Sequence, residues 1–350
     1  MKTTVIFIGD PHFQLNNITD VERFIPAVEA LSKEREPDMI VVAGDLLHTH
    51  ERLHTTVLNQ AYSFVDAIRK IAPVYILVGN HDYISNTQFL TSNHWMNGLK
   101  EWNNVNIVDT VMNVSINTET FTMVPYVYPG RFMEALNTLG DDSWLKSECI
   151  FAHQEFEGCK MGAIVSVEGD KWPLHYPLVV SGHIHSKQRP QKNIFYTGTP
   201  MQIAFGESED NIVAVFKFEN GKELELDEVK LDLPGKKIVY MDVSEISNFT
   251  ADTESDDKVR ITVSGEYEQF KALKKTTKYK ELIDKGVKIV FKVSRDEKHT
   301  EEPETKDIST TDFSKILLSM ILDKRDAVLM NAYDLVVNQK VSKKEDVFFL

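Results

Sequence analysis

The sequence predicts an α/β protein: a two-sheet αββα sandwich with a small α/β capping domain and C-terminal helices. Three observations support this fold class. Short apolar runs of strand length alternate with amphipathic segments of helical spacing near the N-terminus. Strand-like runs then follow one another more closely along the middle of the chain. Polar motifs rich in Asp, Asn and His stand directly after several of these runs, as expected where strands end at one rim.

In the first part of the chain, strand-like and helix-like segments alternate as in parallel β-α-β units. Apolar strand runs are expected at Thr3–Ile8, Met39–Ala43 and Val74–Val78. Between them, Asp20–Ser32 and Val57–Ile71 place their apolar residues at helical spacing. This alternation predicts parallel strands with helices packed outside the sheet. In such sheets the ligand site lies at the carboxyl ends of the strands.

From Val105 this alternation with helices changes, and most of the apolar strand-like runs are separated by polar turns. One helix is expected at Arg131–Leu139. Strands are expected at Val105–Val108, Val111–Ile116, Phe121–Val124, Cys149–Ala152, Leu178–Val180, Ile194–Thr197, Ile212–Phe218 and Leu224–Val229. We interpret the last three as an antiparallel run of edge strands.

Four segments are expected along the chain: a main domain at 1–235, a capping domain at 236–294, a flexible linker at 295–311 and a helical segment at 312–350. Leu233-Pro234-Gly235 marks the first boundary, and strand, helix and strand are expected at Lys258–Val263, Tyr267–Lys275 and Val287–Val293. The linker is poor in large apolar residues. The apolar stripe of the helical segment can be buried only against the parent domain or against a partner protein.

The composition is that of an ordinary globular protein. The 350 residues are 42% hydrophobic and 26% charged, which excludes collagen-like, wholly disordered and disulfide-scaffold classes. Cys149 and Cys159 cannot form a disulfide framework and fit a reducing compartment. The N-terminal apolar run is too short for a signal peptide, and no run reaches the ~20 residues of a membrane span. We therefore expect a cytoplasmic protein with no membrane segment.

Five polar motifs follow the expected strands. They are Asp10-Pro11-His12, Gly44-Asp45, Gly79-Asn80-His81-Asp82, His153 and Gly182-His183-Ile184-His185. Alternate residues of an extended segment project to one side, so Asp-x-His and His-x-His each offer two ligands together. Carboxylates, an amide and imidazoles suit manganese, iron or zinc, and these are too many for one tetrahedral ion. We expect two ions that share a bridging carboxylate and activate a water for displacement at phosphorus.

Each motif taken alone also has an ordinary structural interpretation. Asp10-x-His12 and Gly44-Asp45 are compatible with solvated turns, and His153 with a hydrogen-bonded histidine near a strand end. Gly-Asn-His-Asp and Gly-His-x-His are more specific because each directly follows an apolar strand, and the joint order of all five favours a metal centre. The other histidines are interpreted as surface or packing residues: His50, His54, His94, His175 and His299.

The order of these motifs resembles that of the calcineurin-like metallophosphoesterases. More narrowly, the chain resembles the SbcD-type nucleases, the nuclease subunits of double-strand-break repair complexes, including those of tailed phages. The narrowing features are Gly44-Asp45-Leu46-Leu47-His48, Val124-Pro125-Tyr126, Tyr196-Thr197-Gly198-Thr199-Pro200 and Phe205-Gly206-Glu207. The resemblance implies a metal-dependent phosphodiesterase that acts on DNA.

The resemblance also implies roles for individual residues. One metal would be held by Asp10, His12, Asp45 and His185, and the other by Asp45 as bridge with Asn80, His153 and His183. His81 occupies the family's non-ligand position, where a protonated imidazole stabilises the phosphate and protonates the leaving oxygen. His48 would help to place the phosphate, and Asp82 would orient His81 or Asn80. The expected cofactor is two divalent ions, Mn²⁺ in first place and Mg²⁺ as the alternative.

The formal net charge of −14 argues at first against nucleic acid, since a polyanion is usually met by a basic surface. Two local groups of basic residues are nevertheless candidate DNA contacts. They are Lys187, Arg189 and Lys192 after the last motif, and Lys271, Lys274, Lys275 and Lys278 in the capping domain. A solvated helix face is the alternative interpretation of the second group. We expect the isolated subunit to bind DNA weakly and in a salt-sensitive way, with a partner supplying much of the affinity.

The resemblance implies two protein partners. A helix expected at about Thr87–Trp102 corresponds to the region that forms the homodimer interface in related nucleases, although core packing also explains its apolar residues. The terminal helices resemble the element that docks on the coiled coil of an SbcC-type ATPase subunit. The sequence contains no Walker loop, so any ATP-driven activity would come from another subunit.

Three functions are weighed. The first is a two-metal DNA nuclease, an exonuclease, an endonuclease or both, in a nuclease–ATPase complex of DNA repair, recombination or replication. The second is a phosphodiesterase for a nucleotide or another small phosphoester, which would use the same motifs but has little need of the linker and terminal helices. The third is an inactive scaffold, against which the complete ligand set argues.

Overall fold

The structure is a computed structural model. It describes residues 2–50, 52–219, 222–251 and 255–293, and further along only 317–318, 321–322, 329–330 and 333. The chain divides into two compact units, Met1–Val293 and Ser294–Leu350, and the seven described residues of the second unit are helical. The expected linker at 295–311 lies outside the described residues, as does most of the expected helical segment at 312–350.

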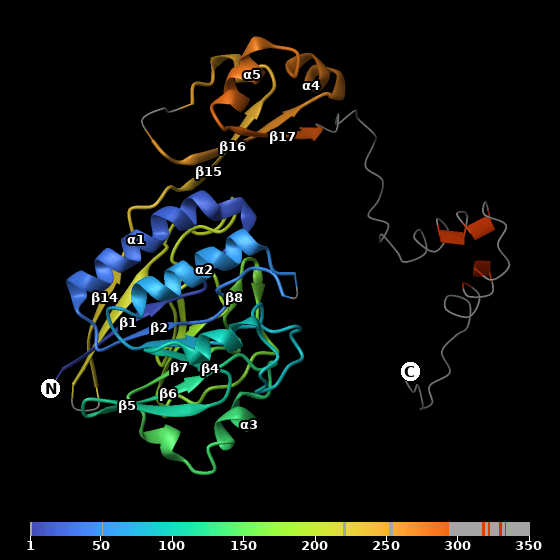
Figure 1. The fold of residues 1–350 in the computed structure, drawn as a ribbon. Helices are drawn as coiled ribbons and strands as arrows, with labels where there is room; N and C mark the ends of the chain where they lie inside the picture. The colour runs from blue at the N-terminus through green and yellow to red at the C-terminus, as the bar shows by residue number, and fades with distance from the viewer. Residues whose placement is uncertain are drawn as a thin grey trace. The chain divides into compact units, whose positions relative to one another are not determined.

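Two six-stranded sheets form the main body of the first unit (Figure 1). In the first sheet, β1 to β4 run parallel, and β13 and then β14 are added antiparallel beside β1. Helices α1 (Ile18–Arg35) and α2 (Thr55–Ile68) follow β1 and β2, as the β-α-β rhythm predicts. The strands are β1 Thr3–Ile8, β2 Met39–Val42, β3 Val74–Leu77, β4 Val105–Val108, β13 Val213–Glu219 and β14 Lys222–Val229.

The second sheet has the strand order β11-β12-β10-β7-β6-β5. Strands β12, β10, β7 and β6 are parallel, while β11 and β5 are antiparallel at the two edges. The expectation that Ile194–Thr197 joins an antiparallel run with the next two strands is therefore wrong. The strands are β5 Met112–Ile116, β6 Glu119–Val124, β7 Cys149–His153, β10 Leu178–Gly182, β11 Gln188–Gln191 and β12 Ile194–Tyr196.

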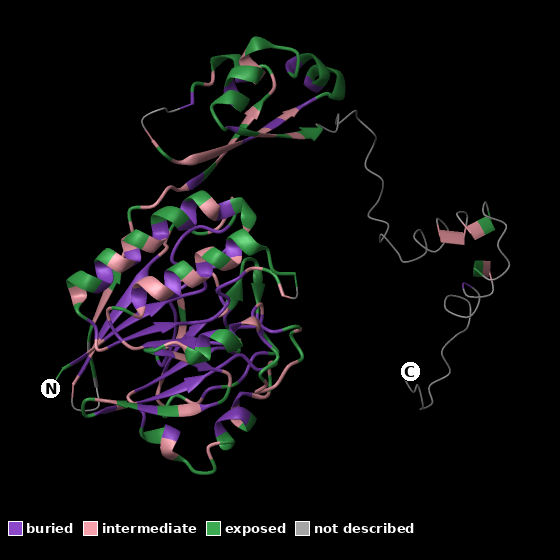
Figure 2. Ribbon diagram, in the orientation of Figure 1, coloured by how far each residue is buried: buried purple, intermediate pink, exposed green. Residues whose placement is uncertain are grey.

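The two sheets pack face to face, and the alternation of side chains along each strand divides the core. In β1, Val5 and Phe7 face the second sheet, where Phe7 stacks on Phe151 with ring centroids 5.6 Å apart. Ile6 and Ile8 face the opposite way and pack with α1 and α2. Figure 1 shows these helices along one outer face and α3 (Phe132–Asn137) along the other, with the buried residues of Figure 2 between them. The predicted αββα sandwich is confirmed.

The expected helix at about Thr87–Trp102 is wrong over most of its length. Only Trp95–Glu101 is helical, as the 3₁₀ segment η2. The preceding stretch contains short polar side chains that bond to nearby backbone or to one another, which competes with helix formation. Thr91 accepts a bond from the Asn93 amide, and His94 caps the 3₁₀ segment by accepting one from Met96.

A separate three-stranded parallel sheet follows the sandwich, in the order β15-β16-β17. Its elements are β15 Lys236–Asp242, β16 Lys258–Gly265, α4 Tyr267–Leu273, α5 Thr277–Asp284 and β17 Lys288–Val293. Strand β15 and helix α5 were not expected from the sequence. This sheet has its own buried core, which includes Ile261, Phe270 and Leu282. The buried carboxylate of Asp20 on α1 joins it to the sandwich through Lys236 (3.1 Å) and Lys258 (2.6 Å).

The remaining short elements are η1 Leu15–Asn17, η3 Ser143–Lys146, η4 Ile246–Asn248, β8 Lys160–Met161 and β9 Ile164–Val165. Cys149 and Cys159 are both free and buried. In the part of the chain that the structure describes, no helix is both long and apolar enough to cross a membrane.

Candidate metal centre

The five polar motifs meet at one rim of the sandwich. Asp10 and His12 follow β1, Asp45 follows β2, and Asn80 follows β3 in the first sheet. In the second sheet, His153 ends β7, and His183 and His185 follow β10. Because the carboxyl ends of these five parallel strands lie at the same edge, residues up to 175 positions apart come together.

One group of ligand atoms is formed by Asp10, His12 and His185. The Nε2 atoms of the two imidazoles lie 2.9 Å apart, a separation typical of two ligands on one ion. The Oδ1 atom of Asp10 is buried and has no hydrogen-bond partner among the described residues, while its Oδ2 accepts a bond from the His183 amide (2.7 Å). A buried carboxylate oxygen with no partner is costly unless a cation completes its surroundings. These residues therefore fit a divalent metal.

A second group of ligand atoms surrounds Asn80. Its Oδ1 atom lies 2.9 Å from both His153 Nε2 and His183 Nδ1. An amide oxygen and two imidazole nitrogens that converge in this way, from three different strand ends, form one face of a coordination shell.

Asp45 lies between the two groups. Its Oδ2 atom is 3.6 Å from His12 Nε2 in the first group and 3.5 Å from His153 Nε2 in the second. Its Oδ1 atom accepts a hydrogen bond from the His81 backbone amide (2.8 Å). This bond fixes the carboxylate so that Oδ2 faces both groups, which is the geometry required of a bridging ligand.

Other side chains and carbonyls orient the candidate ligands. His185 Nδ1 lies 3.3 Å from the Glu207 carboxylate, which itself accepts bonds from the amides of Ile203 (2.7 Å) and Ala204 (2.9 Å). His153 Nδ1 lies 2.8 Å from the Ala43 carbonyl oxygen and donates to it, which leaves Nε2 as the ligand atom. Bonds of this kind set the tautomer and the ring orientation of metal-binding histidines.

The backbone around these residues adopts conformations that are rare for residues with a side chain. His12, Asp45 and His183 have φ of 46°, 48° and 80°. Such strain persists only where the surroundings impose it, and it concentrates at functional sites. Gly79 has no room for a side chain, since an added Cβ would meet Asp45 Oδ1 and the Asp45 amide nitrogen. This close approach carries the loop of Asn80 and His81 against the Asp45 carboxylate.

The electrostatics of the site favour a cation. Burial lowers the pKa of His153, but the charges of Asp45 and Asp10 outweigh this effect and raise it to about 9. Burial raises the pKa of Asp10 to about 6, against the effect of His153. In the metal-free site a proton on His153 therefore offsets part of the negative charge of the two carboxylates. A bound metal ion replaces that proton, because a ligating imidazole must be neutral.

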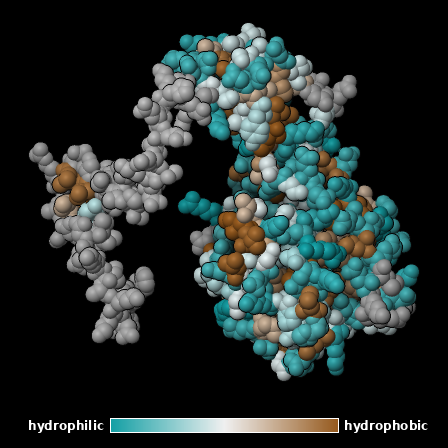
Figure 3. Space-filling view, turned by 180° about the vertical axis from the view of Figure 1, so that it is seen from behind, coloured by the Kyte–Doolittle hydropathy of each residue, from teal (hydrophilic) through white to brown (hydrophobic). Residues whose placement is uncertain are grey.

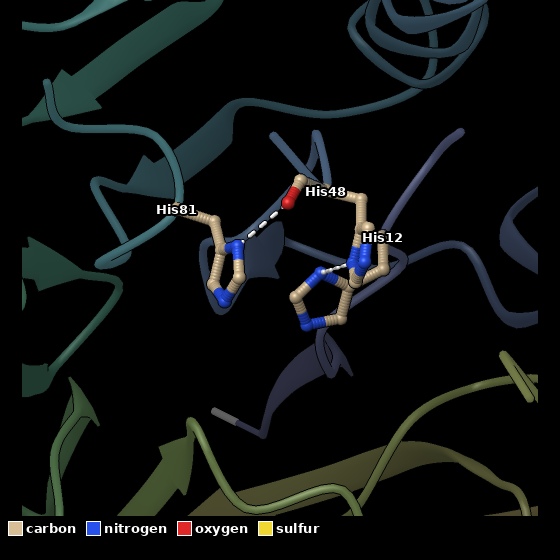
Figure 4. A group of neighbouring side chains, drawn as sticks. All are labelled: His12, His48 and His81. Carbon is tan, nitrogen blue, oxygen red and sulfur yellow. Dashed lines mark hydrogen bonds between the residues drawn. The ribbon is translucent and has the colours of Figure 1, made fainter. Parts of the chain in front are cut away.

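His48 and His81 lie against His12, and the three form a further group of candidate ligand atoms. His81 Nδ1 donates to the carbonyl oxygen of His48 (2.7 Å), and His48 Nδ1 lies 3.3 Å from His12 Nδ1 (Figure 4). The rings of His48 and His50 each lie nearly parallel to that of His81, at centroid distances of 5.4 and 4.8 Å. The ring of His81 therefore stacks with both of these imidazoles. Sequence reasoning did not connect His50 with the site, since it belongs to none of the five motifs.

Asp82 has a different environment from the one expected. Its carboxylate accepts hydrogen bonds from the Gly79 amide (3.0 Å) and from the indole of Trp95 (2.9 Å). Burial raises its pKa to about 7. Asp82 therefore stabilises the loop that presents Asn80 and His81, rather than orienting either side chain directly.

The predicted DNA contacts lie away from the metal ligands or are already paired. Lys187 is bonded to Asp210 (2.7 Å) and Glu228 (2.6 Å). Arg189 is exposed over the ring of Phe195, and Lys192 is exposed. In the capping domain, Lys271 pairs with Glu268, Lys274 lies over the Phe291 ring and Lys278 pairs with Glu281. Lys275, like these three, is not among the residues that line the hollows beside the metal centre.

The sandwich with Asp, His and Asn ligands at one rim defines a metal-dependent phosphoesterase. Residues 3–187, more than half of the chain, match the family model for calcineurin-like phosphoesterases, and the chain belongs to that family. Its hydrolase activity on phosphoesters and its use of divalent metals follow from this membership.

Two relatives come from iridescent viruses, and the name of each calls it a candidate phosphoesterase. Protein 244L of Invertebrate iridescent virus 6 is 52% identical over 275 residues, which cover 77% of this chain and 97% of that protein. Protein 078R of Invertebrate iridescent virus 3 is 44% identical over 326 residues, which cover 92% of each chain. The second alignment extends beyond the residues matched by the family model.

Solved structures with a similar fold are distant. GAP50, the anchor in the inner membrane complex of Plasmodium, is 12% identical with a TM-score of 0.38, covering 66% of this chain and 89% of its own. Vps29 of Entamoeba histolytica in complex with Zn²⁺ is 11% identical with a TM-score of 0.26, covering 65% and 98%.

Proposed function

We propose that this phosphoesterase is a two-metal-dependent DNA nuclease that hydrolyses phosphodiester bonds as the nuclease subunit of a nuclease–ATPase complex. The observation that carries the proposal is a cleft of about 980 Å³ that extends from the metal centre to the capping domain. His48, His185 and Glu207 line one end of it, and Arg260 and Lys288 line the other, together with Lys285, which is paired with Glu281 (2.9 Å).

The charges of this cleft favour an extended polyanion. Its two capping-domain acids are already neutralised, Asp256 by Arg23 (2.8 Å) and Asp257 by Lys237 (2.5 Å). The cations of β16 and β17 that line the cleft lie away from the metal ligands, where a small phosphoester with a single phosphate has no second phosphate to offer. A nucleic acid strand carries a phosphate at every nucleotide, and each can be neutralised in turn.

The residues at the metal centre have separate tasks in hydrolysis. When bound, two divalent ions supply Lewis acidity and lower the pKa of the attacking water. Because His81 Nδ1 donates to the His48 carbonyl, its Nε2 remains for the phosphate and for protonation of the leaving oxygen. Burial, together with His81 and His185, lowers the pKa of His48, which favours a neutral imidazole that positions the phosphate by hydrogen bonding.

The assembly is part of the proposal. Residues 312–350 would dock on the coiled coil of an SbcC-type ATPase, and two copies of this chain would form a homodimer. The sequence supports the first point because it contains an apolar stripe but no Walker loop. Deleting Asp312–Leu350 is expected to spare manganese-dependent cleavage and to abolish capture of the ATPase, and persistent capture would contradict this assignment.

The test compares manganese-dependent hydrolysis of single-stranded DNA, linear duplex DNA, a mononucleotide and bis-p-nitrophenyl phosphate. We expect the double variant Arg260→Ala/Lys288→Ala to lower kcat/KM on DNA about tenfold and to leave bis-p-nitrophenyl phosphate hydrolysis unchanged. Lys271→Ala, a cation outside the cleft, is the matched control. Hydrolysis of the mononucleotide without cleavage of DNA would replace the proposal with a small-molecule phosphodiesterase.

A further inference from the structure

A buried glutamine connects the capping domain to the metal centre. Hydrophilic residues cover most of the surface of the first unit on the face seen in Figure 3, so exposed polar side chains are ordinary in this protein. Gln202 is different, because only 5% of it is exposed. Burying an amide side chain is costly unless its oxygen and its nitrogen both find hydrogen-bond partners. The partners of Gln202 therefore show which parts of the molecule it holds together.

The two polar atoms of the Gln202 side chain bond to different parts of the first unit. Its Oε1 accepts a hydrogen bond from the backbone amide of Lys236, the first residue of β15 in the capping domain (2.5 Å). Its Nε2 donates to the backbone carbonyl oxygen of Glu207 (3.1 Å). Glu207 is the residue whose carboxylate lies against His185 Nδ1. One buried side chain therefore spans from the capping domain to the support of a candidate metal ligand.

The backbone of Gln202 is also held from the capping domain. The ammonium group of Lys236 donates to the Gln202 carbonyl oxygen and pairs with the Asp20 carboxylate of α1 (3.1 Å). The side chains of Lys236 and Asp20 are only 6% and 4% exposed, so removing Asp20 would leave a buried ammonium without this counter-charge. Strand β15 is therefore fixed to Gln202 at two points, through the backbone amide and the side chain of Lys236.

Residues 203–207 form the turn that carries Glu207, and the Glu207 carboxylate is bonded in two directions. One oxygen accepts hydrogen bonds from the amides of Ile203 (2.7 Å) and Ala204 (2.9 Å) and so closes the turn. The other oxygen lies 3.3 Å from His185 Nδ1. Gln202 directly precedes this Glu207 turn and binds its last carbonyl group, so a shift of Gln202 would move the oxygen that orients His185.

We propose that Gln202 is a positioning residue that couples the attachment of the capping domain to metal binding at His185. With β15 in place, Gln202 holds the Glu207 turn, and Glu207 keeps His185 Nε2 beside the ligand atoms of Asp10 and His12. When this attachment is weakened, the group binds a divalent ion less tightly. Linkage requires the reverse as well, so a bound ion strengthens the attachment. The coupling holds for any phosphoester substrate and goes beyond the proposed nuclease function.

The test is calorimetric titration of the full chain with Mn²⁺. In Gln202→Ala, the affinity for one of the two ions is expected to fall about tenfold, as is usual when a residue that orients a metal ligand is lost. Asp20→Asn, which changes no candidate ligand, is expected to weaken the same ion and to add nothing in the Gln202→Ala background. Gln191→Ala is the matched control, because its amide bonds the Trp172 carbonyl oxygen (2.6 Å) instead of the Glu207 turn.

A second measurement is made on the metal-free protein, where hydrogen exchange of the Ile203 and Ala204 amides is expected to be faster in Gln202→Ala than in the wild type. Gln202→Glu keeps an oxygen for the Lys236 amide but lacks the donor to Glu207, and serves if the alanine variant does not fold. Wild-type Mn²⁺ affinity in a folded Gln202 variant would overturn the proposal. So would equal weakening of both ions together with a lower melting temperature, which indicates a purely structural role. Failure of the wild type to cleave DNA would contradict only the proposed nuclease, because this test measures metal binding.

Discussion

The imidazole of His50 lies 4.8 Å from that of His81, with an angle of 14° between the ring planes. His50 Nδ1 donates to the carbonyl oxygen of Tyr83 (3.1 Å), which fixes its own ring. Since His81 Nδ1 is bonded to the His48 carbonyl, the stacked ring limits rotation of His81 and keeps its Nε2 directed at the site. We therefore expect His50 to be a positioning residue that acts through His81.

Replacing His50 by alanine is expected to lower kcat about tenfold with little change in KM, because His81 loses one of the rings that stack with it. His50→Phe keeps a flat ring and is expected to recover much of the activity. Steady-state kinetics on bis-p-nitrophenyl phosphate provide the measurement. Equal loss in both variants, together with a changed metal content, would mean that His50 supports only the fold.

His81→Ala is expected to reduce hydrolysis by roughly 10²–10⁴-fold, the usual contribution of a general acid. The metal content is expected to stay near the wild-type value, because the two ligand groups that Asp45 joins do not include His81, although its side chain lies in a further group of candidate ligand atoms with His12 and His48. Elemental analysis after dialysis, paired with the hydrolysis assay, checks both expectations. Loss of both metals in this variant would contradict the role given to His81.

Metal affinity is expected to depend steeply on pH through His153. Its pKa of about 9 in the metal-free site means that a proton must leave before the ring can bind an ion. Affinity should therefore rise by roughly tenfold per pH unit below about pH 9, with one proton released per chain from this residue. Calorimetric titration in buffers of different ionisation enthalpy measures that release. A pH-independent affinity would be inconsistent with His153 as a ligand.

The stability of the metal-free protein has the opposite dependence on the same group. Because the pKa of His153 is raised from 6.5 to about 9 on folding, its stabilising effect is complete below pH 6.5 and is lost as the pH rises through 9. Melting temperatures with a chelator present should fall over this range, all other groups being equal.

Gly79→Ala is expected to damage the site through one methyl group. The added Cβ would meet Asp45 Oδ1 and the Asp45 amide, so either the bridging carboxylate or the loop of Asn80 must move. Overpacking of this kind costs about 1–3 kcal/mol, and the displaced ligand should lower metal affinity as well. Gly98→Ala is a control for substitution at a glycine, since nothing lies within 4 Å of its added Cβ and Gly98 has no positive φ. Wild-type metal affinity in Gly79→Ala would show that this approach is not critical.

That the candidate ligands come together could be predicted from the sequence, because each follows an apolar strand and parallel strands end at a common rim. The fold class could be predicted from the sequence for the same reason. The contact of His50 with His81 and the pairing of Lys187 with Glu228 could not be predicted, because both depend on contacts between segments that no local sequence pattern connects. The helix expected near Thr87 failed because local side-chain bonds of residues such as Thr91 and His94 compete with a helix there.

The central claim is that Asp45 bridges two ions, and the most direct test is the number of ions bound. The wild-type chain is expected to bind two Mn²⁺ ions with the exchange-coupled signal of a bridged pair in electron paramagnetic resonance. Asp45→Asn keeps an acceptor for the His81 amide but lacks the second carboxylate oxygen, so it is expected to bind at most one ion tightly and to lose the coupled signal. A wild-type protein that binds a single ion, or an Asp45→Asn variant that retains the coupled pair, would contradict the claim.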